Sequence, residues 1–172
     1  MNVAIIGGHL SPALAVIDAK PSGVDVLFIG RKHALEGDQA RSFEEKVISE
    51  KGIPFHALTT GRLQRKLTRH TMVSLFKLPY GAVQAFSLLG KTKPDVILSF
   101  GSYVSLPVVI AASMRNIPVV IHEQTLEAGL ANKIAARFAT KICISWESSM
   151  PFFPREKTVL TGNPIREFRI KN

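Results

Sequence analysis

Cysteine, long apolar runs and acidic residues are all scarce in this chain of 172 residues, and each scarcity excludes a class of protein. The chain has one cysteine, Cys143, so we expect no disulfide framework and no zinc site, and a reducing cytoplasm is the natural setting. No stretch reaches the ~18 uninterrupted apolar residues of a membrane-spanning helix, so membrane contact is expected to be peripheral. Met1 leads directly into an apolar run, and we therefore expect no signal peptide.

The 13 acidic residues are outnumbered by 22 basic ones, which gives a formal net charge of +9. Such a field attracts phosphorylated substrates, anionic lipid and nucleic acid alike, so charge alone does not identify the partner. No recognised DNA- or RNA-binding motif occurs, and the few aromatic residues do not alternate with cations as base-stacking platforms would. We therefore expect no nucleic-acid partner; a basic nucleic-acid-binding module is the rival hypothesis, and salt-sensitive binding to single or double strands would reveal it.

Short apolar runs alternate with amphipathic stretches from one end of the chain to the other. The runs are VAIIG, VDVLFIG, IPFHAL, DVILSF, IPVVIH, KICIS and KTVLTG. This alternation predicts βαβ units and hence an α/β, Rossmann-like doubly wound parallel sheet. Ser11-Pro12 is typical of a helix start, with the serine as N-cap. With 46% hydrophobic residues the chain can form one such domain, but it is too short for two.

Glycine or polar residues follow directly after several of these runs. In an open parallel sheet, ligands bind beyond the carboxyl ends of the strands, where glycine lets the backbone approach and a helix N-terminus offers free N–H groups to an anion. The segments at these positions are Gly7-Gly8-His9, Gly30-Arg31, Gly101-Ser102-Tyr103, His122-Glu123-Gln124 and Gly162-Asn163-Pro164. NAD binding is not expected, because IGGHLSPA lacks the later glycines of a dinucleotide fingerprint and FIGRK ends in cations.

Four stretches of the chain, in order, resemble the N-terminal half of the MurG family of bacterial N-acetylglucosaminyltransferases. They are NVAIIGGHLSPALAV, KPDVILSFGSYVSLPVVIAA, IPVVIHEQTLEAGLANKIAARFATKI and VLTGNPIRE. The resemblance implies one half of a GT-B glycosyltransferase that transfers N-acetylglucosamine from UDP-N-acetylglucosamine to lipid I, a polyprenyl-pyrophosphate-linked sugar, with inversion. It also implies peptidoglycan synthesis at the cytoplasmic face of the bacterial inner membrane as the setting, with peripheral attachment to an anionic membrane surface.

The resemblance further implies how the protein is divided. Residues 1–164 correspond to the acceptor-binding domain and residues 165–172 to the start of an interdomain linker. A second, donor-binding domain is missing from this chain, which is therefore expected to be inactive alone. Two alternatives stay open: this chain is the acceptor-binding and membrane-anchoring subunit of a two-chain glycosyltransferase, or it belongs to another sugar-nucleotide enzyme of the same fold, such as an epimerase. No cofactor is expected, and no metal either, since no D-x-D motif occurs.

Individual residues receive roles from the same resemblance. His9 matches the histidine that closes the first glycine loop of the family and is the candidate general base, since an attacking hydroxyl needs a base nearby. Arg166 and Asn163 are expected to contact the donor. The acceptor and its pyrophosphate are expected to contact Gly7, Gly8, His9, Gly101, Ser102, Tyr103, Glu123, Gln124, Thr125 and Asn132. His122 is interpreted as a structural hydrogen-bonder, and a loop-ordering carboxylate is the alternative role for Glu123.

The chain departs from the family pattern at three places. The first loop reads GGH where the family has GGTGGH, the second reads GSY where the family has GGY, and HEQN has become HEQT at Thr125. A shorter phosphate loop and a lost amide predict an altered acceptor preference or weaker acceptor binding. The resemblance thus implies the class of acceptor, a polyprenyl-pyrophosphate sugar, more directly than lipid I itself.

Residues 59–93 combine a basic cluster with a helix-like segment that is rich in large apolar side chains. These side chains are too many for one core-facing stripe unless a partner or a membrane covers the remainder. Packing on the domain itself or on the missing half is the alternative. We predict membrane contact by Arg62, Arg65, Lys66, Arg69, Leu75, Phe76 and Tyr80.

Overall fold

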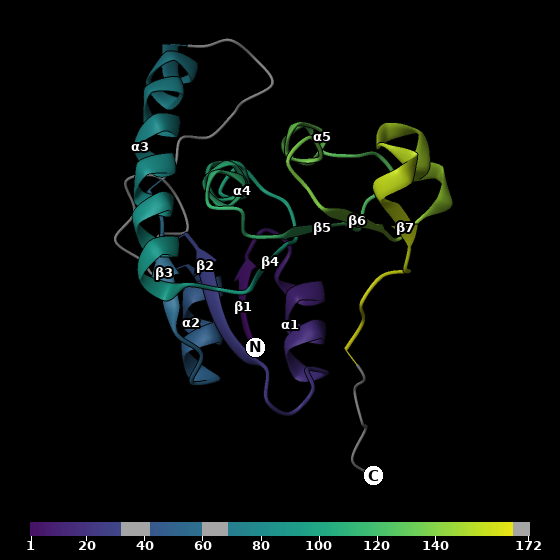
Figure 1. Ribbon diagram of the computed structural model, residues 1–172, viewed down its shortest axis with the longest axis horizontal. Helices are drawn as coiled ribbons and strands as arrows, with labels where there is room; N and C mark the ends of the chain where they lie inside the picture. Colours follow the sequence, from purple (N-terminus) through teal and green to yellow (C-terminus); the bar gives the residue numbers. More distant parts are fainter. Residues whose placement is uncertain (32–41, 60–68, 167–172) are drawn as a thin grey trace.

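The fold is a seven-stranded parallel sheet with helices on both faces, as the computed structural model shows (Figure 1). The structure describes residues 1–31, 42–59 and 69–166, with side chains from residue 79 onward in the last range. The strands are β1 (Asn2–Ile6), β2 (Asp25–Gly30), β3 (Phe55–Ala57), β4 (Val96–Ser99), β5 (Val119–Glu123), β6 (Lys141–Ile144) and β7 (Thr158–Leu160). Each coincides with one of the apolar runs, so the predicted doubly wound α/β sheet is confirmed.

The sheet order is β3-β2-β1-β4-β5-β6-β7, and every neighbouring pair is parallel. Strands β1 to β3 therefore follow one another toward one edge of the sheet. After a crossover, strands β4 to β7 follow one another from β1 toward the other edge. The carboxyl ends of β1 and β4 flank the point where the direction reverses, which is where ligands bind in open α/β sheets. Both glycine loops of the sequence follow these two strands.

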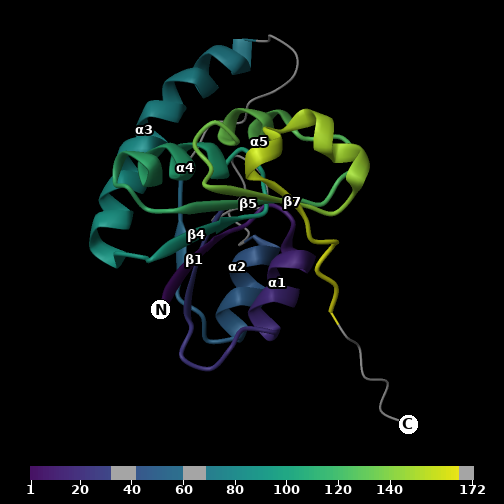
Figure 2. The same cartoon turned by 45° about the vertical axis from the view of Figure 1, so that its right-hand side comes forward.

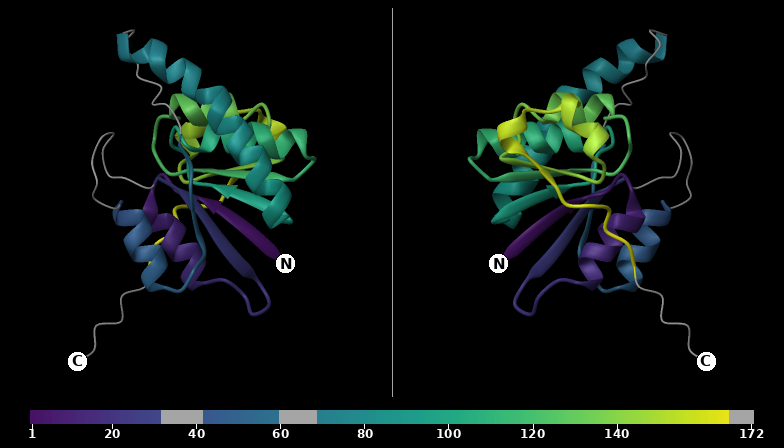
Figure 3. Two further views of the ribbon diagram at one scale, coloured as in Figure 1. Left: turned by 90° about the vertical axis from the view of Figure 1, so that its left-hand side faces the viewer. Right: turned by 90° about the vertical axis from the view of Figure 1, so that its right-hand side faces the viewer.

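Helices cover both faces of the sheet, as two side views show (Figure 3). One face carries α1 (Leu10–Asp18) and α2 (Phe43–Glu50), and the other carries α3 (Arg69–Thr92), α4 (Ser105–Met114) and α5 (Leu130–Ala135). Two short 3₁₀ helices, η1 (Glu147–Phe152) and η2 (Arg155–Lys157), precede β7. Along β1 the side chains alternate between two cores: Ile5 packs with α1, while Ala4 and Ile6 pack with α3 and α4. Burial on both faces explains why the strands read as continuous apolar runs.

The start of α1 differs from the sequence-based prediction. The helix begins at Leu10, with His9 in extended conformation at the N-cap, so the assignment of Ser11 as N-cap was wrong. The His9 side chain makes no capping hydrogen bond to this end of the helix. The position matters for function, because His9 thereby stands between the first glycine loop and the first turn of α1, whose N–H groups donate no capping bond to the His9 side chain and are free to meet a ligand as far as the described residues go.

The longest helix, α3, is only partly covered by the domain. Ala85 and Leu89 are buried against the sheet, whereas Tyr80 and Val83 are 61% and 70% exposed. Arg115 crosses from the end of α4 and lies over the Phe86 ring at 3.9 Å. Within the described part of the chain, no helix is long and apolar enough to cross a membrane.

Candidate functional site

The two glycine loops, after β1 and after β4, are in direct contact. A Cβ atom on Gly8 would lie 2.5 Å from the carbonyl oxygen of Gly101, so only glycine fits there. Gly101 and Ser102 both adopt left-handed conformations, with φ of +83° and +81°. Ser102 Oγ donates to the carbonyl oxygen of Gly7 over 3.0 Å and also accepts from the N–H of Val104 over 3.3 Å. The GSY sequence thus adds a cross-link between the loops that a second glycine would not provide.

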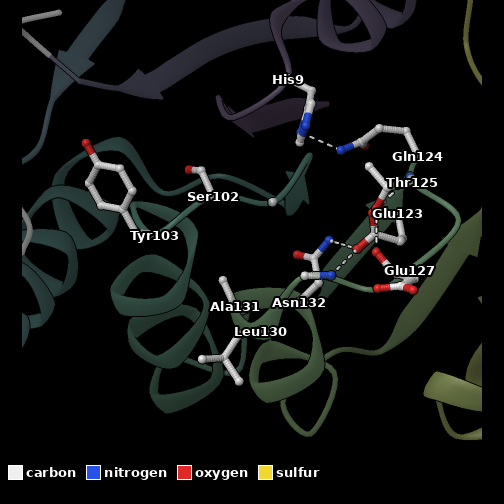
Figure 4. Close-up of a pocket in the computed structure, with 12 residues that line it drawn as sticks. His9, Ser102, Tyr103, Glu123, Gln124, Thr125, Glu127, Leu130, Ala131 and Asn132 are labelled. Carbon is white, nitrogen blue, oxygen red and sulfur yellow. Dashed lines mark hydrogen bonds between the residues drawn. The ribbon is translucent and has the colours of Figure 1, made fainter. Parts of the chain in front are cut away.

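A pocket of about 490 Å³ opens beside these loops at the carboxyl edge of the sheet (Figure 4). It brings together eight of the residues predicted to bind the acceptor: His9, Gly101, Ser102, Tyr103, Glu123, Gln124, Thr125 and Asn132. The sequence analysis missed four further lining residues, Glu127, Gly129, Leu130 and Ala131. These four residues lie in EAGLANK, a few residues after the HEQT segment, and this closeness in sequence could have indicated that they line the same pocket. Gly7 and Gly8 do not line the pocket, although Gly8 lies against Gly101, which does.

Glu123 orders the loop that forms one wall of the pocket. It ends β5, is 2% exposed and accepts four hydrogen bonds. Thr125 donates to Glu123 Oε1 through its N–H at 3.0 Å and its hydroxyl at 2.6 Å, while the Gly129 N–H and Asn132 Nδ2 donate to Oε2 at 3.1 Å and 2.9 Å. Both carboxylate oxygens are therefore occupied, which matches the loop-ordering role that the sequence left as an alternative.

Asn132 lines the pocket and holds a buried acceptor that no described residue uses. Its amide nitrogen bonds to Glu123, but its Oδ1 has no hydrogen-bond partner within the described residues, although the side chain is buried. The amide also packs against Gly101, where a Cβ would lie 3.2 Å from Nδ2. A buried acceptor without a donor costs about 1–3 kcal/mol. Oδ1 therefore leaves an unsatisfied acceptor in the wall of the pocket.

His9 stands on the opposite side of the pocket from Asn132 (Figure 4). Its Nδ1 lies 3.2 Å from the carbonyl oxygen of Phe100 and contacts the side-chain amide of Gln124. No hydrogen bond engages Nε2 within the described part of the chain, so this nitrogen is available to a ligand. A histidine fixed by one ring nitrogen, with the other one free, has the arrangement that a general base needs.

Arg31, at the end of β2, brings a positive charge close to the pocket. Its guanidinium lies 5.5 Å from the centre of the Tyr103 ring, and Nη1 donates to the Tyr103 hydroxyl over 3.4 Å. Nη2 lies 3.9 Å from Glu44 Oε1. The sequence analysis placed Arg31 on this edge of the sheet without giving it a role. In the structure, Tyr103 lines the pocket and contacts Arg31, so Tyr103 connects Arg31 to the pocket.

The two residues predicted to contact the donor are not brought to the pocket. Asn163 is exposed in the segment after β7, and Arg166 Nε donates to Asp18 Oδ2 over 2.9 Å. Asp18 ends α1, away from the carboxyl edge of the sheet, and also accepts from Lys51 Nζ over 2.6 Å. The segment after β7 thus descends beside α1 (Figure 2). A donor contact by Asn163 or Arg166 stays a prediction.

The residues predicted to contact a membrane are described only in part. Arg62, Arg65 and Lys66 lie outside the described residues, and Arg69, Leu75 and Phe76 belong to α3 with side chains that are also outside the description. Tyr80 is exposed, as the prediction requires. Among the described residues, no cluster of His, Cys, Asp and Glu side chains could hold a metal ion.

Comparison with known proteins identifies the family. Residues 6–144 match the model of the glycosyltransferase family 28 N-terminal domain. The chain belongs to this family. Curated relatives include proteins of Lachnospira eligens, 40% identical over 161 residues, and of Halothermothrix orenii, 40% identical over 165 residues. Both are named UDP-N-acetylglucosamine–N-acetylmuramyl-(pentapeptide) pyrophosphoryl-undecaprenol N-acetylglucosamine transferase. The matches cover 93% and 94% of this chain but only 43% and 42% of the relatives.

Solved structures agree with this family 28 assignment. MurG of Acinetobacter baumannii superimposes with a TM-score of 0.74 and 28% identity, over 96% of this chain and 46% of that protein. The resemblance to the N-terminal half of MurG is thereby confirmed, and so is the Rossmann-like fold of a GT-B glycosyltransferase. A UDP-GlcNAc 2-epimerase from Neisseria meningitidis superimposes with a TM-score of 0.64 but is 16% identical, which shows a shared fold alone.

Proposed function

We propose that this chain is the acceptor-binding half of an inverting N-acetylglucosaminyltransferase. The donor is UDP-N-acetylglucosamine, and the acceptor is a sugar linked to a polyprenyl pyrophosphate, with lipid I as the first candidate. One observation carries the proposal: the pocket at the carboxyl edge of the sheet is lined by the second glycine loop, by His9, whose Nε2 no described residue engages, and by Asn132, whose buried Oδ1 has no partner among the described residues. The names of the curated relatives supply the reaction.

The first glycine loop and α1 suit the pyrophosphate. The N-cap of α1, His9, makes no capping hydrogen bond with its side chain, and it follows Gly7 and Gly8 directly. Free N–H groups and the positive end of a helix dipole favour an anion at this place. Arg31 adds a cation on the Tyr103 side of the pocket. The acceptor sugar would then lie deeper, where Asn132 Oδ1 accepts from one of its N–H or O–H groups.

The reaction needs a base on the acceptor side. His9 Nε2 takes the proton of the acceptor hydroxyl while the oxygen attacks the anomeric carbon of the donor. The bond between that carbon and the UDP oxygen breaks, and UDP leaves with the electron pair. Most donor contacts come from the second half of the enzyme, which is either fused to this chain or a separate subunit. The domain boundary near residue 164 belongs to the same proposal.

His9 provides the direct test. In an enzyme that contains both halves, His9→Ala should lower turnover by about 10²-fold or more, the usual contribution of a general base. His56→Ala is the matched control, because His56 lies on the edge strand β3, away from the pocket. Unchanged turnover in a folded His9→Ala enzyme would remove His9 from the reaction and this pocket from the role of acceptor site.

A membrane-bound acceptor requires a membrane-facing surface. We propose peripheral attachment to the cytoplasmic face of the membrane through α3 and the basic cluster before it. The exposed Tyr80 and Val83 support this assignment, since neither is covered by the domain. Attachment at this helix would let the enzyme reach the lipid-linked sugar without extracting it from the bilayer.

A further inference from the structure

Gln124 lies between two histidines and connects them. Its Nε2 contacts His9 Nδ1, and its Oε1 is 3.4 Å from His122 Nδ1. Each histidine also faces a backbone carbonyl: His9 Nδ1 is 3.2 Å from the oxygen of Phe100, and His122 Nε2 is 3.1 Å from the oxygen of Gly162. The result is a continuous row of polar contacts from the segment after β7 to the proposed base.

The carbonyl of Gly162 fixes the position of the proton on His122. A carbonyl oxygen only accepts, so Nε2 of His122 has to carry a proton to bond to Gly162. In a neutral ring Nδ1 of His122 then holds a lone pair and needs an N–H from Gln124. At the other end, two nitrogens lie within reach of the oxygen of Phe100: Nδ1 of His9 at 3.2 Å and Nε2 of Gln124 at 3.4 Å. If the amide oxygen of Gln124 faces His9 instead, only Nδ1 of His9 can donate to Phe100.

The side-chain amide of Gln124 satisfies both histidines in one orientation. With its nitrogen toward His9, as in Figure 4, its oxygen faces His122 Nδ1, and a neutral His122 cannot then donate at both ring nitrogens. A half-turn of the amide exchanges its nitrogen and oxygen without moving other atoms. Its N–H then donates to His122, and its oxygen accepts from Nδ1 of His9. Each ring nitrogen that bears a proton now faces an acceptor, and the lone pair on Nδ1 of His122 receives an N–H; the bond from Gln124 Nε2 to the Phe100 oxygen is given up in exchange.

We propose that His122 and Gln124 are positioning residues that set the tautomer of His9. They hold the proton of His9 on Nδ1 and so leave the lone pair on Nε2, the nitrogen that no described residue engages. This inference rests on the proposed role of His9 as the base. His122 is suited to the task, because it is buried and packs at 5.5 Å against the Phe100 ring, which restricts its rotation.

The row begins in the segment that leads toward the second half of the enzyme. Gly162 has a φ of +78°, and its carbonyl oxygen also accepts from the Thr161 hydroxyl at 3.3 Å. A displacement of Gly162 would remove the acceptor that fixes the proton on His122, and the effect would pass through Gln124 to His9. The proposal thus couples the position of Gly162 to the tautomer of His9.

Nitrogen NMR of the ring atoms in the 172-residue chain tests the proposal without any catalysis. At a pH where imidazole is neutral, His9 should show a protonated Nδ1 and a free lone pair on Nε2. Gln124→Met, which keeps the length but removes both hydrogen-bonding groups, should shift His9 toward the Nε2–H form. Gln84→Met is the matched control, because Gln84 accepts from the Thr59 N–H on another part of the surface and should leave His9 unchanged.

Gln124→Glu separates positioning from a general loss of structure. A carboxylate accepts at both ends, so His9 should keep its Nδ1 proton while His122 acquires a proton on Nδ1. The proposal is wrong if His9 in the unaltered chain carries its proton on Nε2. It is also wrong if both Gln124 variants leave the two rings unchanged, since the Phe100 carbonyl alone would then set the tautomer.

Activity gives an independent readout. In the enzyme with both halves, Gln124→Met should lower kcat about tenfold or more through the base, whereas any rise in KM for the acceptor would report the acceptor contact that is expected of this pocket residue. If the NMR result holds but His9→Ala leaves turnover intact, the proposed function fails while the tautomer assignment stands. If His9→Ala abolishes turnover but the tautomer does not respond to Gln124, the function stands and this inference fails.

Discussion

Ser102 Oγ donates a hydrogen bond to the carbonyl oxygen of Gly7 over 3.0 Å and so joins the loop after β4 to the loop after β1. The contact forms although Ser102 holds a φ of +81°, a conformation that costs a non-glycine residue about 1–2 kcal/mol. Backbone strain of this kind persists only where the surroundings fix it, and it is typical of binding sites. Here it aligns both loops at one edge of the pocket.

Two substitutions of Ser102 separate the strain from the hydrogen bond. Ser102→Ala keeps the strained backbone and loses the bond, so the free energy of unfolding should fall by about 1 kcal/mol. Ser102→Gly loses the same bond but relieves the strain and should be more stable than Ser102→Ala by about 1 kcal/mol. Urea unfolding measures both differences. Equal stability of the two variants would mean that the left-handed conformation carries no cost at this position.

Glu123 should be intolerant of a change that removes one acceptor. In Glu123→Gln an NH₂ group replaces one oxygen and meets N–H or O–H donors, which leaves a buried donor unpaired at a cost of about 1–3 kcal/mol. Glu127→Gln is the matched control, because Glu127 is an exposed residue of the same pocket. Urea unfolding should show a loss for the first variant and little change for the second. Similar midpoints would contradict the ordering role of Glu123.

The strands and the glycine loops could be predicted from the sequence because both depend on local pattern. Strands buried on two faces appear as unbroken apolar runs, and a glycine pair after such a run marks a close approach. The four donors around Glu123 and the φ of Ser102 could not be predicted, since they arise from contacts between distant loops. The N-cap was misplaced at Ser11 for a related reason: His9 is held in position by Phe100 and Gln124, 91 and 115 residues away.

The contact made by Arg166 is a second long-range feature that the sequence did not indicate. A family pattern placed it near the donor, whereas in this structure it pairs with Asp18, 148 residues earlier in the chain. Neither residue carries a sequence signal for the other. The pairing depends on where the segment after β7 runs, and this follows from the packing of the whole sheet and α1.

The ion pairs of Asp18 should make stability depend on pH. The hydrogen bond from Lys51 lowers the pKa of Asp18 most, burial opposes it, and the charges of Lys51 and Arg166 lower it further. A carboxyl whose pKa is lower in the folded state stabilises the protein above its ordinary pKa of 3.8, and this contribution disappears as the pH falls through the folded value. For such an exposed group we expect about 0.2–1 kcal/mol.

Comparison of the unaltered chain with Asp18→Asn tests this dependence. The unaltered chain should be the more stable one at neutral pH, and the difference should vanish in acid and shrink in high salt, which screens exposed charges. Urea unfolding at several pH values provides the measurement. A difference that is the same at every pH would show that the side chain contributes through packing and not through its charge.

The last prediction concerns attachment to a membrane. Each basic residue near an anionic bilayer contributes roughly 1 kcal/mol, so Arg62, Arg65, Lys66 and Arg69 together would supply about 4 kcal/mol before any apolar insertion. Tyr80 and Val83 are exposed on α3 and would add burial in the headgroup region at about 25 cal/mol per Å². The chain should therefore sediment with phosphatidylglycerol vesicles, and the bound fraction should fall as salt is raised.

Substitutions on two helices show whether α3 is the surface that binds. Tyr80→Ser with Val83→Ser should weaken sedimentation, because it removes apolar area that is free to enter the bilayer. Met114→Ser, at a residue 69% exposed at the end of α4, removes exposed apolar area elsewhere and should have little effect. Equal losses in both variants would indicate non-specific adsorption of apolar surface. Sedimentation that is insensitive to salt and to the α3 substitutions, or absent from the start, would mean that α3 packs against another part of the enzyme and that a different surface approaches the lipid-linked acceptor.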